Sequence, residues 1–445
     1  MKKIVLSAMV VGLISSTNVQ AAEDLSSMFS EGKASGQIRA FSISRKMDYS
    51  DPTKEDYRRK ASAIGGHLKF ETADFKGLSL GTAFYTTNGL FNSGNKTDYT
   101  SVDPTLLGPD NDAYSVLGEA YLQYKIGNTV FKGGRQKLDT PLAGSDDARM
   151  LPNLFEAYVL MNSDIPNTTL IAAHVTKFAQ GTFGRAYAGG VLSATSGYSA
   201  ADSRDQVGTF VNMGTYALGA GKETGGVSVV AAAYKNGNFK AQVWDYYAHD
   251  ILNAIYADAT ISWTCLVSDA VKPFLSAQII SESDVGDKYA GKVEGMYYGV
   301  KFGATVGGFT GYVAYSETTD NDATDTALQN AIITPWGGMP AFTQGMVTRH
   351  QFLAGTTATK AALVYNFKEL GLKAVGYYTD FDMDLNNGYT NGDASESGFD
   401  FIYNTPFVKN LQLRVRGNFA DDFNVAATGA TTGWSEYRFI ANYNF

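Results

Sequence analysis

Three aspartates stand close together in one short, irregular stretch of the chain. Residues 134–158 read GRQKLDTPLAGSDDARMLPNLFEAY, with Asp139, Asp146 and Asp147 beside two prolines and Arg149. Clustered carboxylates create a negative potential that attracts cations, and low-dielectric walls strengthen this potential. Simpler interpretations are an acidic turn in solvent, or an ion pair of Asp147 with Arg149 that holds the loop.

Other reactive residue types give no recognisable site. Cys265 is alone, so no intramolecular disulfide forms. Histidines occur at four scattered positions, His67, His174, His249 and His350. The chain contains no HExxH, CxxC or phosphate-loop motif, and no serine stands in a nucleophile elbow. The sequence therefore predicts no catalytic residues, no cofactor-binding residues, no metal ligands and no cofactor.

The elements that position the aspartates belong to one large, repetitive architecture. The chain has 445 residues, yet no proline-rich linker, long charge run or low-complexity tract divides it. Glycine (47), tyrosine (27) and phenylalanine (26) are abundant, and only 18% of the residues are charged. This composition suits many β-strands joined by turns. The net charge of −8 argues against nucleic-acid binding, which normally shows a basic footprint.

The N-terminus has the features of a secretory signal peptide. Lys2 and Lys3 precede an apolar run at 4–15 that is too short to span a bilayer, and residues 19–21, VQA, supply small side chains before a cut. We expect residues 1–21 to be removed, which changes the net charge to −10 because two lysines and no acids are lost. An uncleaved anchor helix is the alternative.

Segments with period-two alternation fill the rest of the chain. The alternation is clear in 116–125, 296–302, 359–367, 411–420 and 435–445, and less regular in 36–45 and 129–136. Segments of about ten alternating residues are the signature of a transmembrane barrel, whose apolar face meets lipid and whose polar face meets a wet lumen. In 116–125 the predicted outward set is Val116, Gly118, Ala120, Leu122 and Tyr124.

The expected fold class is all-β, a transmembrane antiparallel β-barrel. We count about 18 strands, since bacterial single-chain barrels have an even number. Residues 207–217 would make a further strand, and parity places them instead in a long fourth surface loop with a short helix. Residues 88–113, 179–225 and 318–357 are expected to be long outward-facing loops. The expected division is a signal peptide at 1–21, a short periplasmic segment at 22–35 and a barrel at 36–445.

The chain ends on Phe445, which shares one strand face with Phe439 and Tyr443. A terminal aromatic residue on a barrel strand resembles the signal that the barrel-assembly machinery reads. Together with the leader, it predicts an integral protein of the bacterial outer membrane. The expected partners are outer-membrane lipid and lipopolysaccharide, the assembly machinery and small hydrophilic solutes, with the barrel a monomer or a homotrimer.

The opening stretch resembles the matching region of the OprD family of outer-membrane porins, particularly the epsilon-proteobacterial type. The resemblance rests on three runs: Gly134-Arg135-Gln136, Thr140-Pro141 and Asp147-Ala148-Arg149-Met150-Leu151-Pro152-Asn153, with 30–41 also similar. It implies that the third loop, pinned by Pro141 and Pro152, folds into the barrel and narrows it. The pore-constriction residues would then be Asp139, Asp146, Asp147 and Arg149.

Basic side chains fall on the polar faces of the strands, where a lumen would be their natural place. Lysine or arginine near the midplane of the lipid face costs about 2–4 kcal/mol. The predicted basic lumen wall consists of Arg414, Arg416, Arg438, Lys301, Lys360, Lys373 and Lys69. Members of the resembled family are described with a basic ladder that guides carboxylate-bearing solutes. Generic lumen polarity is the alternative for any single residue.

The sequence thus predicts a passive diffusion channel for small hydrophilic solutes, with amino acids and other carboxylates favoured, and no enzyme. A TonB-linked transporter would need a plug domain and about 22 strands. An outer-membrane hydrolase would need a serine with a base and an orienting acid. A surface adhesin built on a barrel is the third alternative, because the outer loops are long.

Overall fold

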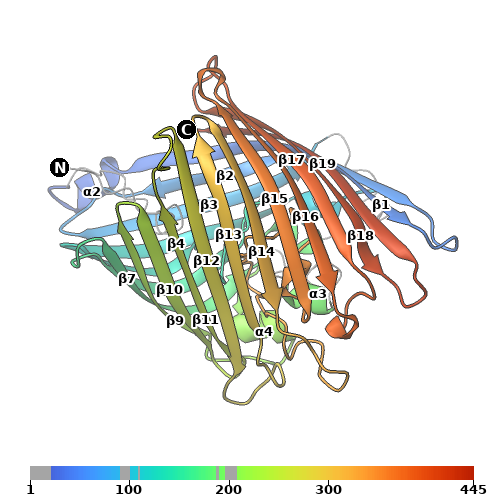
Figure 1. The fold of residues 1–445 in the computed structure, drawn as a ribbon. Coiled ribbons are helices and arrows are strands. Elements are labelled where there is room, and N and C mark those ends of the chain that lie inside the picture. Colours follow the sequence, from blue (N-terminus) through green and yellow to red (C-terminus); the bar gives the residue numbers. More distant parts are fainter. Residues whose placement is uncertain (1–21, 91–100, 109–110, 187–189, 196–207) are drawn as a thin grey trace.

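The fold is a closed barrel. The computed structural model describes residues 22–90, 101–108, 111–186, 190–195 and 208–445, so the predicted leader lies outside the described residues. Nineteen strands of these residues form one antiparallel sheet, and the first strand pairs with both the second and the last (Figure 1). The two-residue strand β8 pairs with β7 beside the point where β7 pairs with β9. Eighteen strands therefore make the wall, as predicted.

The strand bounds are β1 Lys33–Tyr49, β2 Tyr57–Glu71, β3 Leu78–Gly89, β4 Tyr114–Ile126, β5 Thr129–Gln136, β6 Leu154–Asn162, β7 Thr168–Ala179, β8 Val211–Asn212, β9 Val227–Asn236, β10 Phe239–Ala248, β11 Leu252–Ser262, β12 Val271–Asp284, β13 Met296–Val306, β14 Phe309–Thr318, β15 Thr356–Phe367, β16 Leu372–Met383, β17 Ala394–Asn404, β18 Leu411–Val425 and β19 Thr431–Asn444. The short helices are α2 Leu25–Ser30, α3 Val191–Thr195 and α4 Met213–Leu218, and the 3-10 turns are η1 Pro104–Leu106, η3 Thr182–Ala186, η5 His350–Phe352, η6 Lys368–Leu370 and η7 Leu385–Asn387. No helix among the described residues is both long and apolar enough to span a bilayer.

The alternation of side chains sets the two faces of the wall. Val300, Phe302 and Phe439 are 46%, 52% and 57% exposed, whereas Glu436 and Arg438 between such positions are buried. Directly paired residues of adjacent strands share a face, so each exposed apolar side chain identifies its neighbours as outward-facing. The outward band is apolar as lipid requires, and the inner face is polar.

One predicted face is wrong in β4. Leu117, not Val116 or Gly118, faces outward and is 47% exposed, while Val116 is buried with inner-face residues. The pairing with β3 shifts register between Ala83 and Phe84, so a bulge inserts one extra residue into β4. A bulge reverses the alternation on one side of it, which is why the period-two pattern assigned Val116 and Gly118 to the wrong face.

The fourth loop contains the predicted short helix. The side-chain oxygen of Asn212 accepts from the backbone N–H of Gly214 at 2.9 Å, and α4 follows directly. An asparagine in this place satisfies an orphan donor of the first helical turn. Apart from the two-residue strand β8, residues 208–217 are therefore loop and helix rather than a strand that spans the wall, as predicted. Residue 207 lies outside the described residues.

Loop segments pack against the inner face of the wall. One apolar cluster joins Leu142 of the third loop (residues 137–153), Tyr216 of α4 and Trp336 of the seventh loop (residues 319–355) to wall residues such as Trp244. The prediction that 318–357 simply faces outward is wrong for its middle part. The backbone N–H of Phe342 donates to Gln278 of β12, on the inner face, at 2.8 Å. Apolar residues such as Ile332 and Trp336 bury against the wall instead of entering water.

Candidate functional site

The third loop is shaped first by its own hydrogen bonds. The carboxylate of Asp139 accepts from the backbone N–H of Ser145 at 3.0 Å and from its hydroxyl at 2.5 Å. Thr140 and Ala143 close a turn around Pro141, with the Thr140 N–H donating to the Ala143 carbonyl at 2.9 Å. Aspartate commonly binds nearby backbone in this way in turns. Asp139 thus holds the loop's shape.

Asp147 is held by an arginine of the wall. Its Oδ1 lies 2.6 Å from Arg39 Nη1, and its Oδ2 lies 3.3 Å from Nη2. Arg39 also donates to the Arg149 carbonyl at 2.5 Å and to Asn442 at 2.9 Å. Burial acts to raise the pKa of Asp147, but the charge and hydrogen bonds of Arg39, with help from Lys137, hold this pKa below its usual value. The Asp147 side chain is 32% exposed, so one carboxylate of the loop meets solvent.

Asp146 joins the third loop to the seventh. Both terminal nitrogens of Arg349 lie 3.3 Å from Asp146 Oδ2. Beside this pair the two backbones meet, with the Gly144 N–H donating to the Trp336 carbonyl at 3.0 Å. The Arg349 side chain is only 5% exposed and that of Asp146 13%. The two loops therefore form one connected structure.

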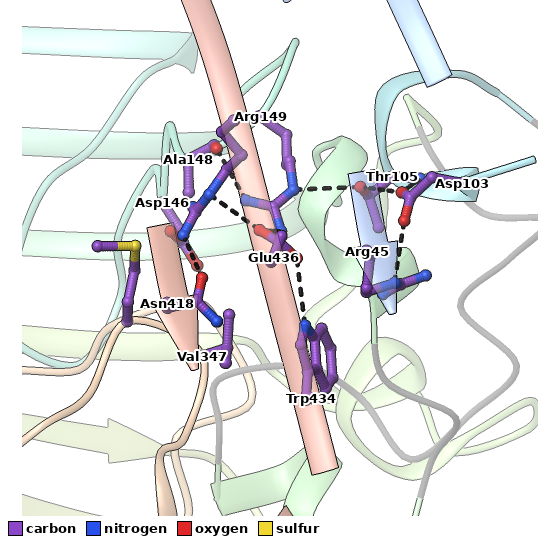
Figure 2. Close-up of polar contacts among 12 residues, drawn as sticks. Arg45, Asp103, Thr105, Asp146, Ala148, Arg149, Val347, Asn418, Trp434 and Glu436 are labelled. Carbon is purple, nitrogen blue, oxygen red and sulfur yellow. Dashed lines mark hydrogen bonds and ion pairs between the residues drawn. The ribbon is translucent and has the colours of Figure 1, made fainter. Parts of the chain in front are cut away.

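Arg149 lies in a buried network rather than on an open surface (Figure 2). Its Nη2 contacts Glu436 Oε1 at 2.8 Å, and its Nε donates to Thr105 Oγ1 at 3.1 Å. Arg438 Nε approaches the same Glu436 oxygen at 2.9 Å. Arg45 pairs with Asp103 at 2.9 Å next to this group. The alternative ion pair of Asp147 with Arg149 is not formed, because each residue has another partner.

The seventh loop is fixed by a carboxylate of the wall. Glu396 of β17 is fully buried and accepts three consecutive backbone N–H groups, from Met346 at 2.5 Å, Val347 at 3.1 Å and Thr348 at 2.6 Å. Tyr377 donates its hydroxyl to the same carboxylate. Charge-assisted hydrogen bonds are about twice as strong as neutral ones, so Glu396 is the main polar attachment of this loop segment.

The predicted basic wall residues all take inner-face positions, with different accessibility. Arg416 and Arg438 are direct partners across β18 and β19, and Arg414 and Arg416 both contact Asp400 of β17. The side chains of Arg414 and Arg416 are 27% and 16% exposed, whereas Arg438 is buried. The lysines differ in their contacts. Lys69 lies between Glu71 and Glu119, and Lys301 lies over the Phe342 ring. Lys360 donates to the Gln344 carbonyl, and Lys373 is exposed near the beginning of β16.

Sequence reasoning missed three arginines of this region, Arg39, Arg45 and Arg349. The inner face of β1 carries Arg39 and Arg45 together with buried Phe41 and Ile43. Because polar and apolar residues share this face, the sequence of β1 shows no clear alternation. The only available signal for these two residues was that an even number of positions separates Arg39 from Arg45, which places both on one face of a strand. Arg349 stands in a loop, where no periodicity exists to assign it a direction.

Among the described residues, the structure gives little support for a metal site or for a hydrolase. No three His, Cys, Asp or Glu side chains in this part of the chain are grouped so as to hold a metal. Ser228 Oγ lies 3.0 Å from His249 Nε2 and 3.1 Å from His174 Nδ1. Within the described ranges, no hydrogen bond joins either imidazole to a carboxylate, so the orienting acid of a hydrolase triad is not in place there.

The closed barrel, the apolar outer band and the polar inner face with its packed loops define an outer-membrane channel. The family model described as "outer membrane porin, OprD family" matches residues 28–445, so the chain belongs to the OprD family and is an integral protein of the outer membrane.

Solved structures share this fold. OccK9 (OpdG) of Pseudomonas aeruginosa is 19% identical with a TM-score of 0.74, covering 94% of this chain and 99% of that one. OccAB3 of Acinetobacter baumannii is 16% identical with a TM-score of 0.73, covering 93% and 99%. OpdK of Pseudomonas aeruginosa, solved with vanillate, is 16% identical with a TM-score of 0.68, covering 93% and 98%. No curated protein sequence matches the chain.

Proposed function

We propose that this porin favours small carboxylate-bearing solutes, amino acids among them, and that it passes them by diffusion without chemistry. The observation that carries the proposal is the pair Arg414 and Arg416, partly exposed on the inner face of β18 and two residues apart. A carboxylate passing them exchanges water for charge-assisted hydrogen bonds. Asp400 holds both guanidiniums, so a solute meets a partly neutralised site that it can also leave. OpdK, one of the structural neighbours, is described with vanillate, an aromatic carboxylate.

The proposed constriction is the third loop with the part of the seventh loop bound to it. Asp147 is the residue proposed to act on passing solutes, because its carboxylate is exposed beside the Arg39 pair. Asp139, Asp146 and Arg149 have structural roles in this proposal: they fix the loop to itself, to Arg349 and to Glu436. An ammonium group would favour the Asp147 side and a carboxylate the Arg414 side.

Liposome swelling tests this proposal. The variant with Arg414→Gln and Arg416→Gln should admit small carboxylates and amino acids several-fold more slowly, while neutral sugars of the same size enter at an unchanged rate. Lys76→Gln with Lys409→Gln, in the exposed periplasmic turns after β2 and β17, is the matched control for loss of two positive charges. Equal slowing of sugars and carboxylates would show a steric change, and no slowing of carboxylates would leave a general diffusion pore.

We also infer that the assembly machinery reads Phe445. This residue follows β19 at the seam of the barrel, where its N–H donates to the Gly36 carbonyl at 3.1 Å. Its ring is 50% exposed and stacks near Tyr443, with 6.4 Å between centroids. An exposed aromatic ring beside the closing strand pair is accessible to a partner that binds this end of the strand.

A further inference from the structure

Charged side chains face away from the lumen where β5 and β6 meet the third loop, at the extracellular ends of these strands. Arg135 pairs directly with Glu156, and two steps further on Gly133 pairs with Tyr158. Phe131 and Leu160, the next pair on that face, are 38% and 45% exposed. Because paired residues share a face and every second residue returns to it, Arg135 and Glu156 lie on the lipid-facing side.

Lys177 of β7 completes this group. It is the direct partner of Glu156 beside a bulge, and its Nζ lies 3.2 Å from Glu156 Oε1. Arg135 Nε lies 3.9 Å from Glu156 Oε2, and the guanidinium stacks 4.3 Å from the Phe210 ring centre. The three side chains, here called the outer basic cluster, are between 28% and 44% exposed. Two cations share one carboxylate, so the outer basic cluster carries a net positive charge.

The neighbouring outward positions are polar near the rim and apolar below it. His174, which pairs with Tyr158 on this face, is hydrogen-bonded to Ser228 of β9. Tyr158 at the level of His174, and Leu160 and Val230 closer to the membrane centre, are apolar side chains of the same face and are 55%, 45% and 57% exposed. The cost of a lipid-facing charge falls toward the interface, so the outer basic cluster lies where lipid head groups meet acyl chains.

The opposite sector of the rim has the opposite charge. Glu317 of β14 faces outward with Tyr298, and Asp380 and Asp382 of β16 lie on the same face as exposed Tyr378. Charge on the outward rim is therefore uneven around the barrel: β14 and β16 carry acidic side chains, whereas β5–β7 carry the outer basic cluster and the β1–β2 pair places Lys46 beside Arg58.

The neighbours of Arg135, Gly134 and Gln136, also indicate that the Arg135 side chain faces outward. Gln136 turns inward and donates to the Ala157 carbonyl at 3.0 Å, whereas Arg135 turns outward. A Cβ on Gly134 would lie 2.3 Å from the Ala120 carbonyl oxygen, and its φ is +122°. The backbone here is tightly fixed, so Arg135 cannot easily rotate toward the lumen.

We propose that the outer basic cluster binds the phosphate of a phosphorylated glycolipid of the outer leaflet, with acyl chains lying along Phe131, Tyr158 and Leu160. Arginine offers a planar set of donors that matches phosphate, and lysine adds a point charge. Glu156 positions both cations and competes with the phosphate for them. The site faces the membrane, so it does not depend on the solute that the pore carries.

The test measures binding of a bis-phosphorylated glucosamine-disaccharide glycolipid to the purified full-length porin in detergent. The double variant Arg135→Gln with Lys177→Gln should bind this lipid about tenfold more weakly, since two charge-assisted contacts are lost. Glu156→Gln should bind it more tightly, because the competing charge is gone. The control, Lys76→Gln with Lys409→Gln, removes the same charge at periplasmic turns and should bind as the unaltered protein does. Conductance of all variants should be unchanged.

Several results would overturn the proposal. One is that the double variant binds the glycolipid as tightly as the unaltered protein does. Another is that the unaltered protein binds the dephosphorylated glycolipid or phosphatidylglycerol as tightly as the bis-phosphorylated glycolipid. A third is that inorganic phosphate at millimolar concentration displaces the lipid. Loss of an oligomer in the double variant, seen by native mass spectrometry, would instead make this sector an interface between copies. If the double variant does not show the heat-modifiable mobility of a folded barrel, Lys177→Gln alone carries the same test with a smaller decrease.

Discussion

Replacing Glu396 by glutamine should release the seventh loop from the inner wall. Glu396 accepts three successive backbone N–H groups, from Met346, Val347 and Thr348, and the carboxylate is fully buried. Glutamine keeps the size of the side chain but offers one carbonyl oxygen instead of two charged oxygens. At least one of the three N–H groups then faces the amide nitrogen and loses its acceptor.

The magnitude follows from the number of bonds. Hydrogen bonds to charged groups contribute about 1.5–3 kcal/mol and neutral ones about 1 kcal/mol. Weakening two bonds and losing a third therefore costs about 3 kcal/mol of local stability. Since about 1.4 kcal/mol corresponds to a factor of ten, the population in which this segment has left the wall should rise about 10²-fold.

Amide hydrogen exchange over the peptide that contains residues 344–350 measures this opening directly. Protection in Glu396→Gln should fall about 10²-fold, and single-channel recordings should show more frequent current steps. Glu282→Gln is the matched control, because Glu282 is also buried on the inner face but accepts a single N–H of this loop, from Ile333 at 2.8 Å. Unchanged protection in Glu396→Gln, or an equal loss in both variants, would refute the assignment of Glu396 as the main attachment.

Three further predictions concern the third loop and the chain end. Replacing Asp146 and Asp147 by asparagine should lower the cation preference in reversal-potential measurements, and an unchanged preference in an intact barrel would place both carboxylates outside the conduction path. Because the pKa of Asp147 is lowered, its ion pair with Arg39 is lost only as the pH falls through that lowered value. Conductance should therefore stay constant from pH 7 to 5. A step in conductance in this range would contradict the pairing of Asp147 with Arg39. Deleting Phe445 should reduce the amount of folded barrel in the outer membrane while refolding in detergent is retained; normal membrane levels would remove the proposed assembly signal.

The wall of the barrel could be predicted from the sequence because lipid imposes a strict pattern. Most outward positions of β13, β15 and β19 are apolar, and each strand returns to that face at every second residue. Local information is sufficient for such strands. It was insufficient in β4, where the bulge at Gly118 reversed the faces, and in β1, where Phe41 and Ile43 lie on the inner face against loop residues. In both places the tertiary packing of the loops, not the membrane, decides the direction.

The contacts of the loops could not be predicted for a different reason. Asp147 is 108 residues from Arg39 in sequence, and Asp146 is 203 residues from Arg349. The closed sheet and the loop contacts bring these partners together across long stretches of sequence. A loop without periodicity carries no signal for the direction of its side chains. The residue types indicated an electrostatic role, but the pairing that determines how much charge remains depends on the closed fold.

The pairing changes the electrostatic meaning of the acidic stretch. Three aspartates in sequence suggest three negative charges at the constriction, yet Asp139 is bonded within the loop, Asp146 pairs with Arg349 and Asp147 pairs with Arg39. The pair that reaches solvent is unequal, because the Asp147 side chain is 32% exposed and the Arg39 side chain 8%. A solute near this pair therefore meets more of the carboxylate than of the guanidinium, and on β18 it meets the partly exposed Arg414. The expected selectivity is accordingly a modest preference set by the unequal exposure of paired charges, which several weak contacts in series can provide without trapping the solute.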